Sequence, residues 1–316
     1  MDPLKFFKSS KVLIIAGKGG VGRTTVAATI ALSASKVLDK VIIVELEGKS
    51  SLPNYFDFDS SLKFESQRVA DHLEAMRVTP DDSLIEYMHD HGLKAISKRL
   101  VKSGVIDIVS TAVPGIKDIL VLGKIKQLEM ETDYDLIVVD APATGHTLSF
   151  LLSAQGLIES ARGGPVKVQS QEVLEMLADP KRCQVCLVTL PEETPAVETI
   201  EAAFTLEDKV GVKLGPLIVN GIISSNLKET SLDNLKLYKE KLQPGEFRAY
   251  KRAAEFIMEK ERLQQDQIDK LNRLLPLPQI ELFELFTTEI TLSELEILSQ
   301  TFEAGVKKIN DEFIEN

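Results

Sequence analysis

The sequence is poor in the residues that mark secreted, zinc-stabilised and membrane-spanning proteins. Its 316 residues include two cysteines and no tryptophan. Two thiols are too few for the disulfide framework of a small secreted domain, and one pair cannot complete a four-ligand structural zinc site within one chain. Nowhere does an apolar run approach the roughly 20 residues that span a bilayer, and the N-terminus lacks the apolar core of a signal peptide. We therefore expect a cytoplasmic protein with no transmembrane segment.

Basic residues are also too few for a general nucleic-acid-binding protein. Lysine and arginine total 37 against 48 aspartates and glutamates, which gives a formal net charge of −11. A chain of that charge repels a phosphate backbone and an anionic membrane surface. We expect no nucleic-acid partner.

The two cysteines form one Cys-x-x-Cys pair, Cys183 and Cys186, in a strand-like setting. Side chains alternate between the faces of a strand, so this odd spacing places the two thiols on opposite faces. We expect both to be small, buried, apolar side chains. A zinc site to which two chains each donate a pair is the alternative.

The chain is organised around residues 11–29, KVLIIAGKGGVGRTTVAAT, where an apolar run precedes a glycine-rich loop and an alanine-rich segment. The run 12–15 is typical of a strand buried on both faces. The glycines let consecutive amides point at a phosphate, and the helix that follows offers its positive N-terminal end to the same anion. Thr24 stands where a P-loop hydroxyl coordinates magnesium. The predicted phosphate-binding loop consists of Gly17, Lys18, Gly19, Gly20, Val21, Gly22, Arg23, Thr24 and Thr25.

One residue departs from the P-loop pattern, because Arg23 occupies the place of the lysine that precedes the threonine. Lysine is a compact charge that reaches the β- and γ-phosphates, whereas arginine is a wider planar fork that grips phosphate but misplaces the γ-phosphoryl group during transfer. We expect nucleotide binding to survive at this loop and hydrolysis to be slower.

The run GKGGVGRTT at residues 17–25 resembles the deviant Walker A loop, GKGGVGKTT, of the ArsA and tail-anchored-protein-targeting ATPases, relatives of MinD and the nitrogenase iron protein. The resemblance implies an α/β P-loop NTPase fold, with a mainly parallel sheet flanked by helices, and ATP or ADP with Mg²⁺ as ligands. It also implies that Lys18 acts across a dimer interface on the partner's nucleotide. Because the chain has one P-loop, we expect a homodimer or a heterodimer with a paralogue.

A second motif lies at residues 134–150, YDLIVVDAPATGHTLSF, whose apolar run ends at Asp140. The carboxyl ends of parallel strands are where α/β sheets place nucleotide ligands, and an acid there supports magnesium in Walker B fashion. The stretch DAPATGHT is similar to the family's switch II, DTAPTGHT. The resemblance implies that Asp140 supports the metal, and we expect His146 to make a structural hydrogen bond rather than to catalyse.

Two acids compete for the role of orienting the attacking water. The turn-rich loop 46–56 resembles the family's switch I, DPAHNLSDAF, and an ungapped match places Glu47 at the position of its first Asp. The resemblance therefore implies that Glu47 orients the water. Glu45 is an alternative, and in a third interpretation both are exposed loop acids.

Three residues are implied by the resemblance to contact adenine. Pro191 and Glu192 lie in the loop that follows the strand predicted at 184–189, and Asn220 follows the strand predicted at 214–220. A side-chain amide offers both a donor and an acceptor, which matches the adenine edge. The alternative for Asn220 is a turn formed with the glycine that follows it.

We predict a single P-loop ATPase domain over residues 1–316, with a helical insert at about 58–131. Thr79 and Pro80 have the pattern of a helix start within it. In the family this interval grips a hydrophobic client, so the resemblance implies a client or membrane-protein partner. Judged from the residues alone, its apolar faces also fit packing on one another and on a dimer partner.

The leading hypothesis is an ATPase that uses nucleotide binding and hydrolysis to switch a dimer and act on a client, with Lys18, Glu47 and Asp140 as catalytic residues. The second is a low-turnover, nucleotide-dependent scaffold that pairs with a paralogue, which Arg23 favours. An arsenite-transport ATPase is less favoured, because a metalloid needs soft thiolate ligands and only two cysteines are present.

Overall fold

The computed structural model describes residues 1–46, 51–58, 60–90, 115–142, 147–160, 163–225 and 242–315. Its strands form one nine-stranded sheet in the order β3-β4-β2-β5-β1-β6-β8-β9, with β7 beside β6. Only β3 and β4 pair in an antiparallel manner among these strands. The strands are β1 (Val12–Gly17), β2 (Val41–Leu46), β3 (Gln67–Ala70), β4 (Leu73–Val78), β5 (Leu136–Asp140), β6 (Cys183–Thr189), β7 (Lys213–Leu214), β8 (Leu217–Ile222) and β9 (Gln279–Phe283).

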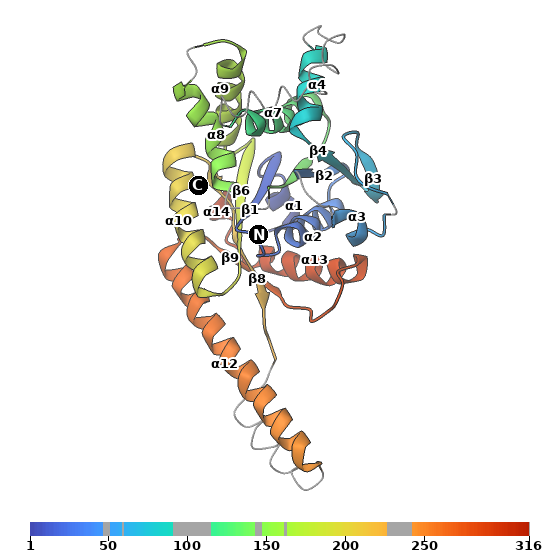
Figure 1. Cartoon of the computed structure of the whole chain (residues 1–316), viewed down its shortest axis with the longest axis vertical. Helices are drawn as coiled ribbons and strands as arrows, with labels where there is room; N and C mark the ends of the chain where they lie inside the picture. The colour runs from blue at the N-terminus through green and yellow to red at the C-terminus, as the bar shows by residue number, and fades with distance from the viewer. Residues whose placement is uncertain are drawn as a thin grey trace.

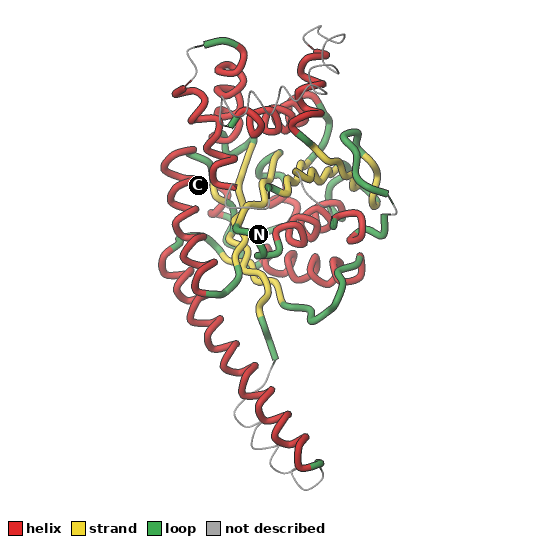
Figure 2. Tube along the Cα trace, viewed as in Figure 1, coloured by secondary structure: helices red, strands yellow, loops and turns green. Residues whose placement is uncertain are grey.

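Helices cover both faces of this sheet (Figures 1 and 2). Residues of α1 (Pro3–Phe7), α2 (Arg23–Ser35), α3 (Leu52–Tyr55), α13 (Leu292–Lys307) and α14 (Glu312–Glu315) pack in the core on one face. The core on the other face receives α7 (Ile116–Glu131), α8 (Thr147–Ser160), α9 (Pro165–Ala178), α10 (Glu193–Val210) and α12 (Pro244–Leu274). The predicted α/β fold with a mainly parallel sheet is therefore confirmed.

The central strands are apolar along their whole length because both of their faces are covered. Every residue of β5 and β6 is buried, as parallel strands between two helical layers require. Cys183 packs in one core and Cys186 in the other, and both thiols are free. The expectation of two small buried side chains on opposite faces is confirmed.

The interval 58–131 differs from the prediction of helices throughout. Its first part contains β3 and β4, and β4 extends the main sheet by pairing with β2. The helices α4 (Pro80–Asp90) and α7 follow, whereas residues 91–114 lie outside the described part of the chain. The helix start at Thr79 is confirmed, because its hydroxyl oxygen accepts a hydrogen bond from the amide of Asp82 at 3.2 Å.

The 31-residue helix α12 extends well beyond the sheet (Figure 1). About two thirds of the way along the helix, the buried side chain of Gln264 joins it to the end of β8. The Gln264 amide donates to the carbonyl oxygen of Gly221 at 3.0 Å and accepts from the backbone amide of Ile223 at 2.9 Å. No helix in the described ranges is both long and apolar enough to cross a membrane.

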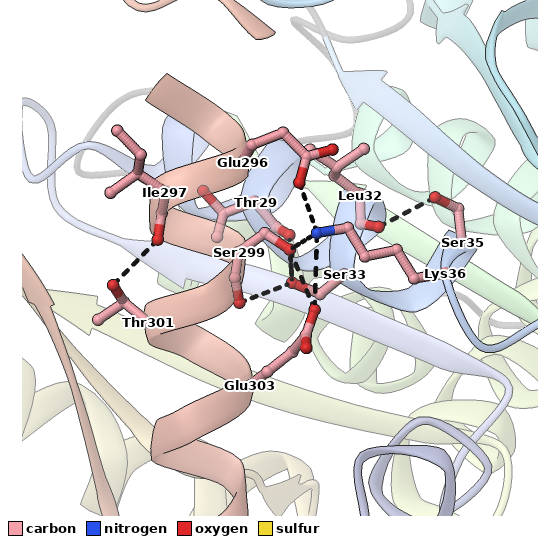
Figure 3. Close-up of polar contacts among 10 residues, drawn as sticks. All are labelled: Thr29, Leu32, Ser33, Ser35, Lys36, Glu296, Ile297, Ser299, Thr301 and Glu303. Atoms are coloured by element: carbon pink, nitrogen blue, oxygen red, sulfur yellow. Dashed lines mark hydrogen bonds and ion pairs between the residues drawn. The ribbon is translucent and has the colours of Figure 1, made fainter. Parts of the chain in front are cut away.

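The helix that follows the glycine-rich loop, α2, is held in place by α13 (Figure 3). Lys36 Nζ lies 2.6 Å from Glu296 Oε2 and 2.8 Å from Ser299 Oγ. The hydroxyl oxygens of Ser33 and Ser299 are 2.9 Å apart, and both serines are buried. Because each buried hydroxyl has a partner, this contact joins the two helices without an unpaired polar group.

Phe302 should be the main apolar anchor of α13. Its side chain is fully buried, with its ring centroid 5.9 Å from that of Phe6 and 6.2 Å from that of Phe7. Phe302→Ala should lower the free energy of unfolding by about 3–5 kcal/mol, because it removes buried apolar surface and leaves a cavity. Ile297→Ala on the same helix, where the side chain is 52% exposed, should change it by less than about 0.5 kcal/mol. Urea unfolding measures both, and equal losses would show that Phe302 is not an anchor.

Candidate functional site

The glycine-rich loop joins β1 to α2, so the predicted order of strand, loop and helix is confirmed. Gly22 ends the loop in a left-handed conformation with φ 83°, and a Cβ there would lie 2.3 Å from Asn220 Nδ2. Only glycine fits such a position without displacing its neighbour. Asn220 Nδ2 donates a hydrogen bond to the carbonyl oxygen of Val21 at 2.9 Å. The end of β8 thus fixes the last turn of the loop.

The loop presents its middle to solvent and its end to the core. Lys18, Gly19 and Gly20 are exposed, whereas Val21 and Arg23 are buried. A cavity of about 230 Å³ lies between the start of the loop and α10. The loop backbone is therefore open to a ligand on one side and rigidly supported on the other.

Thr24 and Asp140 meet at the carboxyl edge of the sheet. The parallel register of β1 and β5 pairs Ile15 with Asp140, and α2 returns over this edge. Thr24 Oγ1 donates a hydrogen bond to Asp140 Oδ2 at 2.7 Å. The second carboxylate oxygen, Asp140 Oδ1, is buried and has no hydrogen-bond partner within the described residues. A hydroxyl and a carboxylate are the hard oxygen ligands that magnesium prefers, so these two residues fit that ion.

The carboxyl group of Asp140 is held in an environment that disfavours its charge. Burial raises its pKa to about 6, while the hydrogen bond from Thr24 and the positive charge of Arg23 act in the opposite direction. A buried carboxylate with one unpartnered oxygen costs free energy in the absence of a cation. The site is therefore built to gain from a positive charge placed beside Asp140.

Arg23 contacts the chain immediately after Asp140. Its Nη1 donates to the carbonyl oxygen of Ala141 at 3.0 Å and also to the carbonyl oxygen of Pro142. The side chain is only 6% exposed, and burial lowers its pKa against the opposing effect of Asp140. The predicted contact of Arg23 with phosphate stays a prediction, but its guanidinium has protein partners that the sequence did not reveal.

Lys18 has a partner within its own chain. Its Nζ lies 3.0 Å from Glu198 Oε1 on α10, and both side chains are partly exposed. Exposed pairs of this kind contribute little to stability, so this one is readily broken. The predicted role of Lys18 across a dimer interface stays a prediction.

Of the two acids that compete to orient the attacking water, the structure describes Glu45 and not Glu47. Glu45 is buried near the end of β2, where the register pairs it with Asp140 on β5. The interpretation of Glu45 as an exposed loop acid is therefore wrong. Glu47 and His146 lie outside the described residues, and their roles stay predictions. Residues in register on neighbouring parallel strands point to the same face, so Glu45 and Asp140 share the face covered by α2.

Sequence reasoning missed one contact at the start of α2. The hydroxyl oxygens of Tyr55 and Thr25 are 3.1 Å apart. Tyr55 belongs to α3, which lies within the stretch 46–56 predicted to be switch I. The only signal in the sequence was an aromatic side chain in a turn-rich segment, which indicates no particular partner.

The residues predicted to contact adenine lie at the same edge of the sheet. Pro191 is buried and Glu192 is exposed, directly before α10. Asn220 lies within β8, so its interpretation as part of a simple turn is wrong. A Cβ at Gly221 would lie 3.2 Å from Leu190 Cδ2, which shows that the ends of β6 and β8 approach closely. Contact of these residues with a base stays a prediction.

Comparison with known proteins gives consistent matches. A family model described as anion-transporting ATPase matches residues 10–161, which include the glycine-rich loop and Asp140. ATPase BagA from Mycobacterium tuberculosis is 32% identical over 230 residues, covering 69% of this chain and 67% of the relative. A candidate arsenical pump-driving ATPase from Halobacterium salinarum is 27% identical over 261 residues, covering 76% and 39%. ATPase GET3 from Mycosarcoma maydis is 29% identical over 154 residues, covering 49% and 45%.

Asp140 should make the metal-free protein less stable as the pH rises. The pKa of an unfolded aspartate is about 3.9, whereas that of folded Asp140 is raised to about 6. The folded state holds the proton more tightly, so this stabilisation is complete below about pH 4 and is lost as the pH rises through about 6. As the pH rises from 4 to 7, the free energy of unfolding of Asp140→Asn should therefore increase relative to that of the wild type, by up to about 3 kcal/mol.

Urea unfolding in the presence of a chelator at the two pH values measures this gain. Asp311→Asn is the matched control, because a hydrogen bond from Lys5 lowers the pKa of Asp311. The difference between wild type and that variant should change little from pH 4 to pH 7, because a lowered pKa places the titration of Asp311 below this interval. A constant difference between Asp140→Asn and the wild type at both pH values would contradict the expected role of burial.

Proposed function

The chain belongs to the family of anion-transporting ATPases, and on that premise we propose that it binds ATP with Mg²⁺ at the glycine-rich loop and hydrolyses it. The hydrogen bond between Thr24 and Asp140 is the observation that carries the proposal. It joins a loop hydroxyl to the acid at the end of β5, beside an open backbone of glycines. This combination suits a phosphate-bound magnesium ion.

The residues have separate tasks in this proposal. The amides of residues 17–25 and the N-terminus of α2 bind the phosphates. Thr24 and Asp140 hold the ion, which when bound neutralises charge on the phosphates during transfer. The attacking water is oriented by Glu47, or by Glu45, which is buried on β2 beside Asp140 of β5.

We propose that Pro191, Glu192 and Asn220 contact adenine and so form the base side of the site, meaning the part that receives the nucleotide base. The close approach of Leu190 to Gly221 supports this assignment, because it brings the chain next to Pro191 and the chain next to Asn220 together. Asn220 also holds Val21 of the loop. One side chain thus serves both the base side and the phosphate side of the nucleotide.

We further propose that nucleotide binding switches a dimer, formed by two copies of this chain or with a paralogue. The chain has one glycine-rich loop, and Lys18 lies in the solvent-exposed part of that loop. Its pairing with Glu198 is weak enough to be exchanged for a phosphate of the partner's nucleotide. Lys18 completes the partner's site in this arrangement.

The helices above the sheet supply the surface for a client. A cleft of about 810 Å³ lies between α4, α7 and α9, with Leu84, Tyr87, Ile119 and Val166 among its apolar lining residues. Charged side chains, including Lys124 and Glu172, also line it. We propose that this cleft takes up an apolar segment of a client or membrane protein, since packing among the described helices does not close it.

A second candidate function is a low-turnover scaffold that binds nucleotide and works with a paralogue. The hydrogen bonds of Arg23 to Ala141 and Pro142 favour it. A cation occupied in this way is less available to stabilise the transferred phosphoryl group.

Phosphate release tests the proposed enzyme. The purified chain with ATP and Mg²⁺ should release phosphate, and Asp140→Asn should release it at least about 100-fold more slowly, because the acid that supports the metal is lost. Asp133→Asn, a surface acid seven positions earlier whose side chain is 81% exposed, is the control and should keep the wild-type rate. Equal turnover in wild type and Asp140→Asn would remove Asp140 from the mechanism.

Arg23→Lys separates the enzyme from the scaffold. Restoring the compact lysine should raise the rate of phosphate release about tenfold or more if the arginine is what limits turnover. The affinity for a fluorescent ATP analogue should be measured in parallel, so that a change in binding is not mistaken for a change in rate. An unchanged rate in a folded, nucleotide-binding variant would count against the scaffold.

A further inference from the structure

Two adjacent residues of the glycine-rich loop hold three consecutive residues at the end of β5. Thr24 holds Asp140, and Arg23 holds Ala141 and Pro142. The amide of Ala141 still donates to the carbonyl oxygen of Ile15 on β1 at 3.2 Å. Beyond that bond the chain leaves the sheet, and the two carbonyl groups that follow have the guanidinium of Arg23 as a donor.

The side chain of Arg23 also passes along the loop itself. Its Cδ lies 3.4 Å from the position that a Cβ would take at Gly17. The same side chain therefore lies against the first glycine of the loop and reaches the chain after Asp140.

Arginine suits this double contact better than the lysine of the usual pattern. The guanidinium carries several N–H donors in one plane, whereas an ammonium ends one atom nearer to the backbone. Nη1 of Arg23 reaches two successive carbonyl oxygens from its buried position. A lysine at the same place has a shorter reach to both.

We infer that Arg23 is a positioning residue: in the ligand-free protein it fixes Ala141 and Pro142, and a phosphate bound in the loop competes with their carbonyl groups for its guanidinium. The inference rests on the proposed function, because the competitor is the nucleotide. A phosphate carries full negative charge and attracts a guanidinium more strongly than a neutral carbonyl does. Occupation of the loop therefore releases Ala141 and Pro142.

The first arm of the test needs no nucleotide. Hydrogen exchange, followed by mass spectrometry, is compared for the peptide that spans residues 140–150 in the wild type and in Arg23→Lys. We expect several-fold faster exchange in the variant, because the shorter lysine holds Ala141 and Pro142 less firmly and the bond from the Ala141 amide to Ile15 then opens more often. Arg68→Lys, at a 71% exposed side chain, should leave the peptide unchanged. Equal exchange in Arg23→Lys and the wild type would overturn the inference.

The second arm adds Mg²⁺ with ADP or a non-hydrolysable ATP analogue, under conditions in which a fluorescent analogue reports binding. The nucleotide should speed exchange of the same peptide in the wild type and leave that of Arg23→Lys unaltered. A wild type that binds nucleotide without any change in this peptide contradicts the competition. A wild type that binds no nucleotide contradicts the proposed function instead, while the first arm still decides whether Arg23 holds the segment.

Arg23→Gln provides a second variant should the lysine variant fail to fold, as judged by its melting temperature. Glutamine keeps a side-chain amide donor but is shorter and carries no charge. It should also speed exchange of the 140–150 peptide and make that exchange insensitive to nucleotide. Slow exchange in a folded Arg23→Gln protein would show that the segment does not depend on residue 23.

Discussion

The parallel pairing of β1 with β5 is the constraint on which the whole candidate site depends. It sets Ile15 level with Asp140, so that β1 can turn into the loop and bring Thr24 back over the carboxylate. Because side chains alternate along a strand, a slip of one residue would point Asp140 to the opposite face. The buried apolar residues of the two strands prevent such a slip, since it would also exchange their packing between two different cores. Core packing thus fixes the distance between two polar groups that belong to separate motifs.

The sequence predicted the parts of the fold whose signal is local. The apolar run of β1, the glycines after it and the run that ends at Asp140 each carry their own pattern, and all lie where expected. The pair β3 and β4 was missed because β3 is only four residues long and none of its residues is buried, so its strand state depends on its neighbour rather than on its own periodicity. The partners of Arg23 were missed for a related reason. They lie 118 and 119 positions away in the chain and are carbonyl groups, which every residue has.

Buried charge is concentrated where the ligand is expected. Arg23, Glu45 and Asp140 are each almost inaccessible to solvent, although burial of charged groups opposes folding. Neighbouring strands hold Glu45 and Asp140 in place, so these two carboxylates need little reorganisation when compensating charge arrives. Preorganised groups of this kind act more strongly than mobile ones, because their orientation has already been fixed during folding.

The junction between α12 and β8 links the end of β8 that carries Asn220 to a distant part of the molecule. Gln264 bonds to backbone groups on both sides of Ile222, directly after Asn220 in the chain. From this junction to its first residue, Pro244, the helix extends about 30 Å at about 1.5 Å per residue. A tilt of about 5° at the junction would carry that far end about 3 Å. A helix of this length would therefore amplify, at its far end, an adjustment at the junction that is too small to alter the sheet.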